Sequence, residues 1–189
     1  MENEISPLTD EVIAAKVQNG DVETFAVLAG RYRQKLIRYG NKLVFNNSEV
    51  EDTVQEVLLK AFRYIQSFDA GQKFSPWIYR IAHNEFINLG KKRSRELLDF
   101  FDPETFLPHL GLKDLAENLS GNEWAREMLN ECLDNLDIKY QEPLVLHYLE
   151  GFGYKEVGQI LKIPTGTVSI RIARGLAKLK VICKSSKPL

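Results

Sequence analysis

The chain contains 189 residues, 27% of them charged and 44% hydrophobic, which predicts a soluble globular protein of one domain or two small ones. Its formal net charge of −1 argues mildly against a nucleic-acid-binding protein, because such proteins usually carry a basic excess. No apolar run approaches the ~20 residues of a membrane span, and the acidic first ten residues lack the basic start of a signal peptide, so we expect no membrane insertion.

Capping residues and apolar residues at three- and four-residue spacing predict four helices in the first half of the chain. Their expected first turns are marked by Asp10, Asp21, the capping box Ser48–Glu51, and Ser75 followed by Pro76. Their expected ends lie near Val17, Leu43, Ile65 and Leu89. A turn at Phe68–Gly71 separates the last two helices.

The second half of the chain predicts four more helices, over residues 124–136, 141–149, 154–161 and 165–180. Gly151–Gly153 and Lys162–Pro164 separate the last three. No run alternates with period two for long enough to indicate a sheet. The predicted fold class is therefore all-α.

The charge is unevenly distributed along the chain. Residues 1–95 carry a net +2, residues 96–130 a net −6 and residues 131–189 a net +3, and the last 27 residues hold six basic side chains and no acid. The acidic stretch also contains prolines and glycines typical of a linker. We therefore expect helical domains at residues 1–95 and 126–189, joined by an acidic linker at residues 96–125.

The sequence offers little for catalysis. Cys132 and Cys183 lie far apart and form no C-x-x-C motif, so we expect neither a disulfide framework nor a zinc site, and the cytoplasm is the favoured compartment. The three histidines are isolated, and no phosphate-binding loop or nucleophile elbow occurs. We expect no enzymatic activity, no cofactor, no metal and no small-molecule substrate.

Residues 154–180 are typical of a helix-turn-helix, in which two short helices are separated by about four residues. Val157, Ile160, Leu161, Ile163, Val168 and Ile172 are expected to face inward, and Gly158 to lie where the helices cross. The outward positions are Thr165, Thr167, Ser169, Ile170, Arg171, Arg174 and Lys178. Such a helix fits a major groove, with Arg171 suited to a guanine and Thr167 to a phosphate. An ordinary helical hairpin with a solvated basic face is the alternative, and Lys162 replaces the glycine common in the turn.

The segment 68–95 interleaves aromatic residues with Arg, Lys and Asn. Trp77, Arg80, His83 and Asn84 share one side of the expected helix, and Lys91, Lys92 and Arg93 form a basic cluster at its end. Single-stranded nucleic acid is bound by rings that stack on bases and cations that follow the backbone. Alternatively, Trp77, Phe74 and Phe86 are core residues and the cluster is solvated; His83 is expected at the surface.

Together these segments resemble the sigma-70 family of bacterial transcription initiation factors, specifically its ECF (extracytoplasmic function) group, which lacks a separate middle domain. Residues 10–95 resemble region 2 and residues 126–182 resemble region 4. The residues that carry the resemblance are Asp52–Phe62, Phe74–Asn84 and Ile163–Val168. The sequence departs from the family at Gly158, Ser169, Ile170 and Gly175.

The resemblance implies a role for each segment. The residues expected to bind core RNA polymerase are Asp52, Gln55, Glu56 and Leu59. Those expected at the −10 element, where an extruded base would be held, are Phe68, Asp69, Lys73, Phe74, Trp77, Arg80, Asn84, Lys91, Lys92 and Arg93. The outward residues of the helix-turn-helix would bind the −35 element. The implied partners are core RNA polymerase, promoter DNA and an inhibitory anti-sigma factor.

Two other functions remain open at this point. A stand-alone helix-turn-helix regulator with an N-terminal sensing or dimerisation domain would bind a duplex without polymerase. A helical enzyme or adaptor with an incidental basic hairpin would not bind DNA.

Overall fold

The computed structural model describes residues 8–43, 47–93, 132–133 and 135–185, and it describes the backbone alone at 47–48, 90–93 and 184–185. The elements of the first half are α1 (Asp10–Gln18), η1 (Val22–Thr24), α2 (Phe25–Leu43), α3 (Asn47–Tyr64), η2 (Ile65–Ser67) and α4 (Phe74–Arg93). Those of the second half are α7 (Ile138–Leu144), the π-helical turn η4 (Val145–Leu149), α8 (Tyr154–Leu161) and α9 (Thr165–Ser185). All described elements are helical, which confirms the all-α prediction. The expected linker at 96–125 and most of the expected helix at 124–136 lie outside the described residues.

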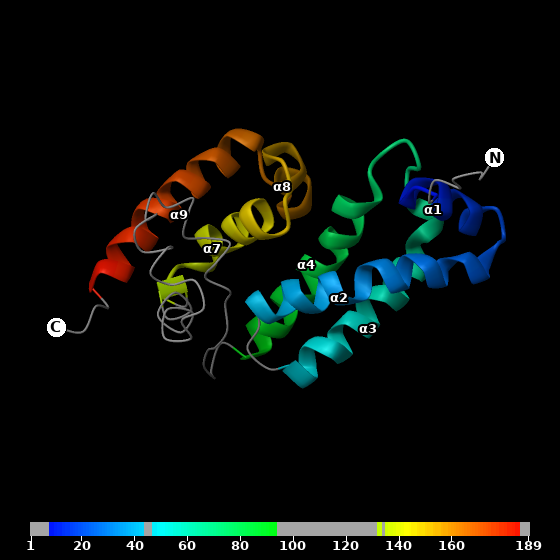
Figure 1. Cartoon of the computed structure of the whole chain (residues 1–189), viewed down its shortest axis with the longest axis horizontal. Helices are drawn as coiled ribbons and strands as arrows, with labels where there is room; N and C mark the ends of the chain where they lie inside the picture. Colours follow the sequence, from blue (N-terminus) through cyan, green and yellow to red (C-terminus); the bar gives the residue numbers. More distant parts are fainter. Residues whose placement is uncertain (1–7, 44–46, 94–131, 134, 186–189) are drawn as a thin grey trace, which may run out of the picture.

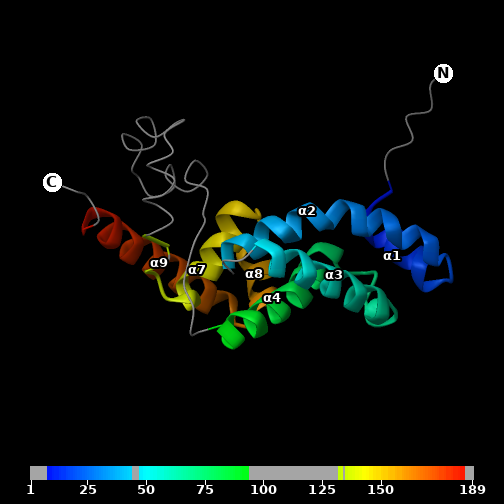
Figure 2. The same ribbon diagram turned by 90° about the horizontal axis from the view of Figure 1, so that it is seen from below.

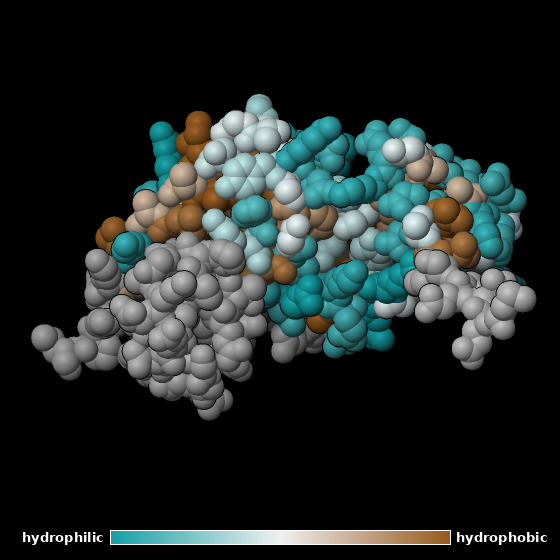
Figure 3. Space-filling view, turned by 45° about the horizontal axis from the view of Figure 1, so that its top comes forward, coloured by the Kyte–Doolittle hydropathy of each residue, from teal (hydrophilic) through white to brown (hydrophobic). Residues whose placement is uncertain are grey.

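Helices α1 to α4 form one bundle and α7 to α9 a second, as Figure 1 and the view from below in Figure 2 show. The first bundle is held by apolar faces that the helical spacing predicted, and the fully buried side chains Leu28, Leu36, Val57, Ile78 and Phe86 lie in its core. Figure 3 shows that on one face of the molecule the hydrophobic areas are small and separated by hydrophilic surface. Val22, which follows the expected cap Asp21, is 53% exposed and so does not join this core.

The cap of α1 differs from the prediction. Thr9 is the N-cap, and its hydroxyl accepts a hydrogen bond from the Val12 amide at 3.4 Å. Asp10 instead binds Arg31 and the Tyr32 hydroxyl of α2, both at 2.6 Å, because these donors from a neighbouring helix compete for its carboxylate. Similarly, Asp21 makes no side-chain cap and precedes the short η1 turn.

Two further helix starts were predicted too late. Helix α4 begins at Phe74, before Ser75, because the Glu11 carboxylate of α1 accepts the Phe74 amide at 3.0 Å and so satisfies a free N–H at the helix start. Helix α7 begins at Ile138, three residues before the expected Gln141.

The helix-turn-helix α8–α9 follows the predicted pattern closely. Val157, Ile160, Val168 and Ile172 are buried. At Gly158, an added Cβ would lie 2.8 Å from the backbone oxygen of Ile163, so the close approach of the turn explains a glycine at this departure from the family pattern.

Two other residues of this motif also have a structural explanation. Lys162 ends α8 in the left-handed conformation, with φ 54°, which is where a glycine is usually favoured. Gly175 lies against α7, where an added Cβ would be 3.0 Å from the Leu144 Cδ1 atom and 3.3 Å from the Tyr140 Cβ and backbone oxygen.

The expectation for the cysteines is wrong. A disulfide joins Cys132 to Cys183, whose Cα atoms are 5.3 Å apart although 51 residues separate them in sequence. The end of α9 lies beside the segment that precedes α7, since Leu136 and Ile182 line the same surface groove. Sequence separation therefore gave no measure of the distance between the two sulfurs.

Candidate nucleic-acid interface

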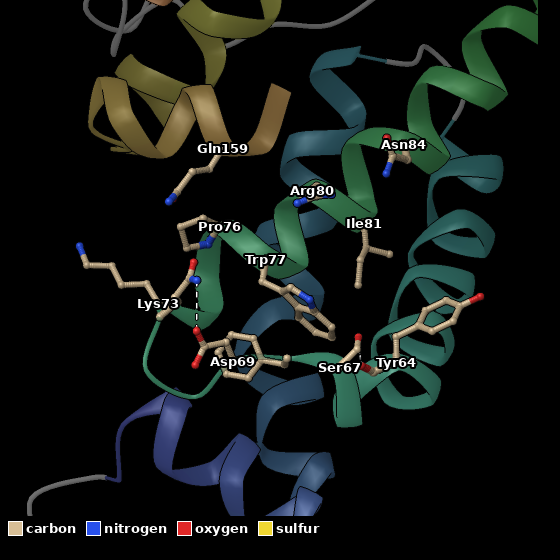
Figure 4. Close-up of a pocket in the computed structure, with 12 residues that line it drawn as sticks. Tyr64, Ser67, Asp69, Lys73, Pro76, Trp77, Arg80, Ile81, Asn84 and Gln159 are labelled. Carbon is tan, nitrogen blue, oxygen red and sulfur yellow. Dashed lines mark hydrogen bonds between the residues drawn. The ribbon is translucent and has the colours of Figure 1, made fainter. Parts of the chain in front are cut away.

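A pocket of about 490 Å³ opens between α4 and the turn that follows α3 (Figure 4). It is lined by Tyr64, Ser67, Phe68, Asp69, Gln72, Lys73, Pro76, Trp77, Arg80, Ile81, Asn84 and Gln159. Its volume lies within the range of small-ligand sites. The structure thus brings together most of the residues that the sequence predicted at the −10 element.

Three aromatic rings form one cluster at this pocket. The ring centroids of Phe68, Phe74 and Trp77 lie 5.3 Å from one another, in tilted or edge-to-face arrangements. Phe74 is fully buried and Phe68 is 5% exposed, whereas Trp77 is half-buried and lines the pocket. Phe74 therefore supports the other two rings from the core, and Trp77 presents its ring to the pocket.

The turn that carries the pocket wall is fixed by side chains of α1. The Gln18 amide donates hydrogen bonds to the backbone oxygens of Ile65 and Phe68, both at 2.7 Å. Glu11 accepts the Phe74 amide at the start of α4. Burial opposes the charged form of Glu11, but the hydrogen bonds from Phe74 and from its own amide outweigh it and lower the pKa of the carboxyl.

Polar groups surround the opening of the pocket. Asp69 organises its own turn by accepting the Gly71 amide at 2.9 Å and the Gln72 side-chain amide at 3.2 Å. Arg80 and Asn84 are exposed on α4, one turn apart. The side chains of Lys91, Lys92 and Arg93 lie outside the described residues, although their backbone continues α4.

The second bundle reaches this pocket. Gln159 of α8 lines it from the side opposite Tyr64 and Ser67 (Figure 4). Lys73 donates to the Glu156 carboxylate of α8 at 2.8 Å. Burial opposes ionisation of Glu156, but hydrogen bonds from Lys73 and from the Gly153 amide outweigh it and lower the pKa of the carboxyl.

His83 is not the surface histidine that the sequence predicted. Its Nδ1 atom lies 2.8 Å from the Glu142 carboxylate of α7, and its side chain is only 16% exposed. Helix α7 therefore covers this side of α4. A sequence pattern cannot reveal such cover, because the covering residue is 59 positions away.

Helix α9 presents the predicted polar face to solvent. Thr165, Ser169, Arg174 and Lys178 are exposed, and Ile170 is 52% exposed. Arg171 and Thr167 are half-buried. The Lys178 ammonium lies 5.6 Å from the centre of the Tyr140 ring. These side chains follow one another along the first four turns of the helix, which is the arrangement that major-groove recognition requires.

A separate exposed face lies on α3. Asp52, Gln55, Glu56 and Leu59 are all exposed, and Leu59 is 47% exposed. Their spacing places them on one side of the helix, away from the buried Val54.

No helix within the described parts of the chain is both long and apolar enough to cross a membrane. Over the same residues, no three His, Cys, Asp or Glu side chains gather where they would hold a metal ion.

Comparison with known proteins assigns the family. Models of sigma-70 region 2 and sigma-70 region 4 match residues 28–96 and 126–179. The ECF RNA polymerase sigma-E factor of Escherichia coli (strain K12) is 33% identical over 173 residues, which cover 88% of this chain and 90% of that protein. The same-named factor of Haemophilus influenzae is 32% identical over 173 residues, covering 88% and 91%. This chain belongs to the ECF group of the sigma-70 family.

The sigma factor is thus a transcription initiation factor that binds RNA polymerase and directs it to specific promoters, as the resemblance implied. The pocket residues other than Gln159 lie in its region 2, and α8 and most of α9 lie in its region 4. The alternatives of a stand-alone regulator and of an adaptor are therefore set aside.

Two solved structures share the fold of this sigma factor. CnrH, solved in complex with the cytosolic domain of CnrY, is 24% identical with a TM-score of 0.70, and the match covers 94% of this chain and 99% of CnrH. The sigma factor RpoE of Bartonella quintana, solved with the anti-sigma factor NepR, is 21% identical with a TM-score of 0.64, covering 88% and 99%.

Several residues at the interface were missed by the sequence reasoning. Gln18 and Glu11 fix the pocket from α1, and Gln159 lines it from α8. Their positions in the sequence carry no motif.

Proposed function

We propose that the pocket of region 2 holds an unpaired base of the −10 element while the cations around it follow the DNA backbone. The observation that carries this proposal is the half-buried Trp77 ring, backed by Phe68 and Phe74, at the wall of a pocket with Arg80 and Asn84 beside it. Extrusion of a base costs a few kcal/mol, and stacking on an aromatic ring offsets it. Lys73, Lys91, Lys92 and Arg93 would add phosphate contacts.

Region 4 is proposed to read the −35 element through the exposed face of α9. Arg171 is suited to a bidentate contact with a guanine, and Thr167 at the helix start is suited to a phosphate. Thr165, Ser169, Ile170, Arg174 and Lys178 would complete the contact surface. The exposure of these side chains supports the proposal.

The proposed docking face for core RNA polymerase is the exposed side of α3 formed by Asp52, Gln55, Glu56 and Leu59. This face combines acidic groups with an exposed leucine, so an apolar contact would be surrounded by polar groups. We also propose that the first domain ends at residue 95 and the second begins at residue 126. The proposed location is the cytoplasm, and the protein is proposed to have no catalytic activity apart from that of the polymerase.

Regulation by an anti-sigma factor is also proposed. Of the two solved structures with this fold, CnrH is in complex with the cytosolic domain of CnrY, and RpoE is in complex with the anti-sigma factor NepR. A partner that holds regions 2 and 4 would keep polymerase from both.

The test is permanganate mapping of a promoter with core RNA polymerase and this sigma factor. Permanganate oxidises unpaired thymines, so reactivity should appear within the −10 element when the sigma factor is present. The matched variant is Asn88→Ala, an exposed residue of the same helix that does not line the pocket. The proposal would be contradicted if the −10 thymines were as reactive to permanganate with Trp77→Ala as with Asn88→Ala.

A further inference from the structure

Tyr64, the last residue of α3, is an exposed aromatic residue at the pocket of region 2. In the part of the chain that the structure describes, Phe62 and Tyr64 are the two exposed aromatic residues, at 38% and 58%. The Phe62 ring packs edge-to-face on the Phe25 ring, with centroids 5.1 Å apart. Tyr64 makes no ring contact with a described residue, and it alone of the two lines the pocket. The pocket therefore has an aromatic ring at its edge that packing does not explain.

The backbone that carries Tyr64 is held by hydrogen bonds on both sides. The Ser67 hydroxyl donates to the Tyr64 backbone oxygen at 2.7 Å. The Gln18 side-chain amide donates to the Ile65 backbone oxygen at 2.7 Å, and the Gln66 side-chain amide donates to the Gln18 backbone oxygen at 3.1 Å. The ring is thus attached to a fixed backbone. Ordering it against a ligand costs little entropy, because a tyrosine side chain has few rotatable bonds.

Tyr64 and Trp77 are separate ring surfaces in one pocket. Trp77 packs on Phe68 and Phe74, whereas no ring contact joins it to Tyr64. Figure 4 shows Ile81 of α4 between the two rings and the Tyr64 hydroxyl pointing away from Trp77. A pocket of about 490 Å³ is larger than a single base needs. The pocket therefore offers a second ring on which a base can stack.

Arg80 provides a positive charge at the same pocket. Its side chain is exposed, lines the pocket and forms no ion pair with a described residue. Asn84 lies one turn further along α4 and is also exposed in the pocket wall. Sites for single-stranded nucleic acid typically combine rings that stack on successive bases with cations that follow the phosphates. The rings of Trp77 and Tyr64, with Arg80 in the same wall, have this composition.

We propose that Tyr64 stacks on a second unpaired base, the neighbour in the strand of the base held at Trp77, and that Arg80 contacts the phosphate that joins the two nucleotides. The proposal rests on the proposed function of the pocket and adds a second base site to it. A purine is favoured at this second site, because its larger ring system makes more contacts with the tyrosine ring. Tyr64 thereby contributes to the sequence preference at the −10 element, and its hydroxyl is not required.

The test measures how tightly the purified holoenzyme, formed from core RNA polymerase and this sigma factor, binds a fluorescein-labelled single strand. The strand carries the −10 sequence that the holoenzyme selects from a promoter library. Each nucleotide of the element is replaced in turn by an abasic nucleotide, which removes the base and keeps the phosphates. With the wild-type protein, the dissociation constant should rise for abasic replacement at two neighbouring positions.

Tyr64→Ala should weaken binding of the intact strand by about five- to thirtyfold, in the lower part of the range for base stacking because the ring is largely exposed. It should also cancel the effect of abasic replacement at one of the two positions, while Trp77→Ala cancels the effect at the other. Tyr64→Phe should bind every strand as the wild type does, because it keeps the ring. Phe62→Ala is the matched control: it removes an exposed ring of the same helix outside the pocket, and it should cancel the effect at neither position.

Two results would overturn the second base site. One is a Tyr64→Ala holoenzyme that binds the intact strand as tightly as the wild type. The other is an equal loss on the intact strand and on every abasic strand, because such a loss depends on no particular base. If Trp77→Ala still cancels the effect at one position in either case, the second site is wrong and the pocket stands. If Trp77→Ala cancels the effect at no position, the base pocket itself is wrong and the second site fails with it.

Discussion

Replacing Trp77 by alanine is the perturbation that most clearly separates DNA binding at the pocket from packing in the core. The indole lies 5.3 Å from both Phe68 and Phe74, and it is half-buried. Stacking of a base on an aromatic ring contributes about 1–3 kcal/mol, which corresponds to about five- to 150-fold in the population of open complexes. Loss of packing for a half-buried ring should cost about 2 kcal/mol of folding stability, below the range for a fully buried tryptophan.

The assay compares closed and open promoter complexes formed with core polymerase. Closed complexes, trapped at low temperature and measured by gel shift, should form normally with Trp77→Ala, while permanganate-reactive open complexes should fall by the factor above. Trp77→Phe should retain part of the activity. Ile78→Val is the control for packing, because Ile78 is fully buried beside Trp77 but does not line the pocket, and its cost should be about 1 kcal/mol of stability without loss of opening. An equal loss of closed and open complexes with Trp77→Ala would refute the stacking role and leave Trp77 as a core residue.

Four further substitutions test the recognition helix, the turn of the helix-turn-helix and the cap of α4. Arg171→Ala should relax base preference at one position of the −35 element at a cost of about 1–3 kcal/mol, measured by selection from a promoter library; a uniform loss over all sequences would mark a phosphate contact instead. Gly158→Ala should lower the free energy of unfolding by about 1–3 kcal/mol, because the added Cβ clashes with the backbone of the turn. Lys162→Gly should raise the free energy of unfolding by about 0.5–1 kcal/mol, because glycine adopts the positive φ without strain. Urea denaturation that shows no change in either variant would contradict the turn geometry. The pKa of Glu11 is lower in the folded state than in the unfolded state, so its bond to Phe74 adds stability above the unfolded pKa, and this stability is lost as the pH falls through the folded pKa. Glu11→Gln should therefore lower the melting temperature more at pH 7 than at pH 3. An equal loss at both pH values would argue against an ionised cap.

The sequence predicted the interior of each helical bundle well because burial follows the helical period. The spacing of Leu28, Leu36 and Ile78 placed them on apolar faces, and all are fully buried. Helix ends were less predictable, since the partner of a free amide can come from another helix. Glu11 caps α4 from 63 residues away, which no local pattern contains.

The assembly of the two bundles could not be predicted from the sequence. Glu150 precedes the Gly151–Gly153 break and belongs to no motif, yet its side chain is 2% exposed because Arg38 and Tyr79 converge on it. Cys132 and Cys183 were expected to be unpaired for the same reason: local patterns do not report which distant segments lie together. The candidate pocket was only partly predicted. Its α4 and loop residues form a recognisable segment, whereas Gln159 comes from the other domain.

The charge distribution gains a structural meaning from the contact between the bundles. The near-neutral chain combines a basic α9 with acidic side chains at Glu142, Glu150 and Glu156, and all three acids contact region 2. The acidic side chains of region 4 thus lie at its contact with region 2, while the cations Arg174 and Lys178 of α9 remain exposed.

Run-off transcription from a promoter library, with core RNA polymerase and the full-length protein, tests the central claim most directly. The account predicts transcripts from a subset of promoters that share −10 and −35 sequences, present with this sigma factor and absent with core polymerase alone. It also predicts that Arg171→Ala changes which −35 sequences are selected, while Trp77→Ala reduces the yield from every selected promoter. Active core polymerase that gives no promoter-specific transcript with this protein would contradict the account.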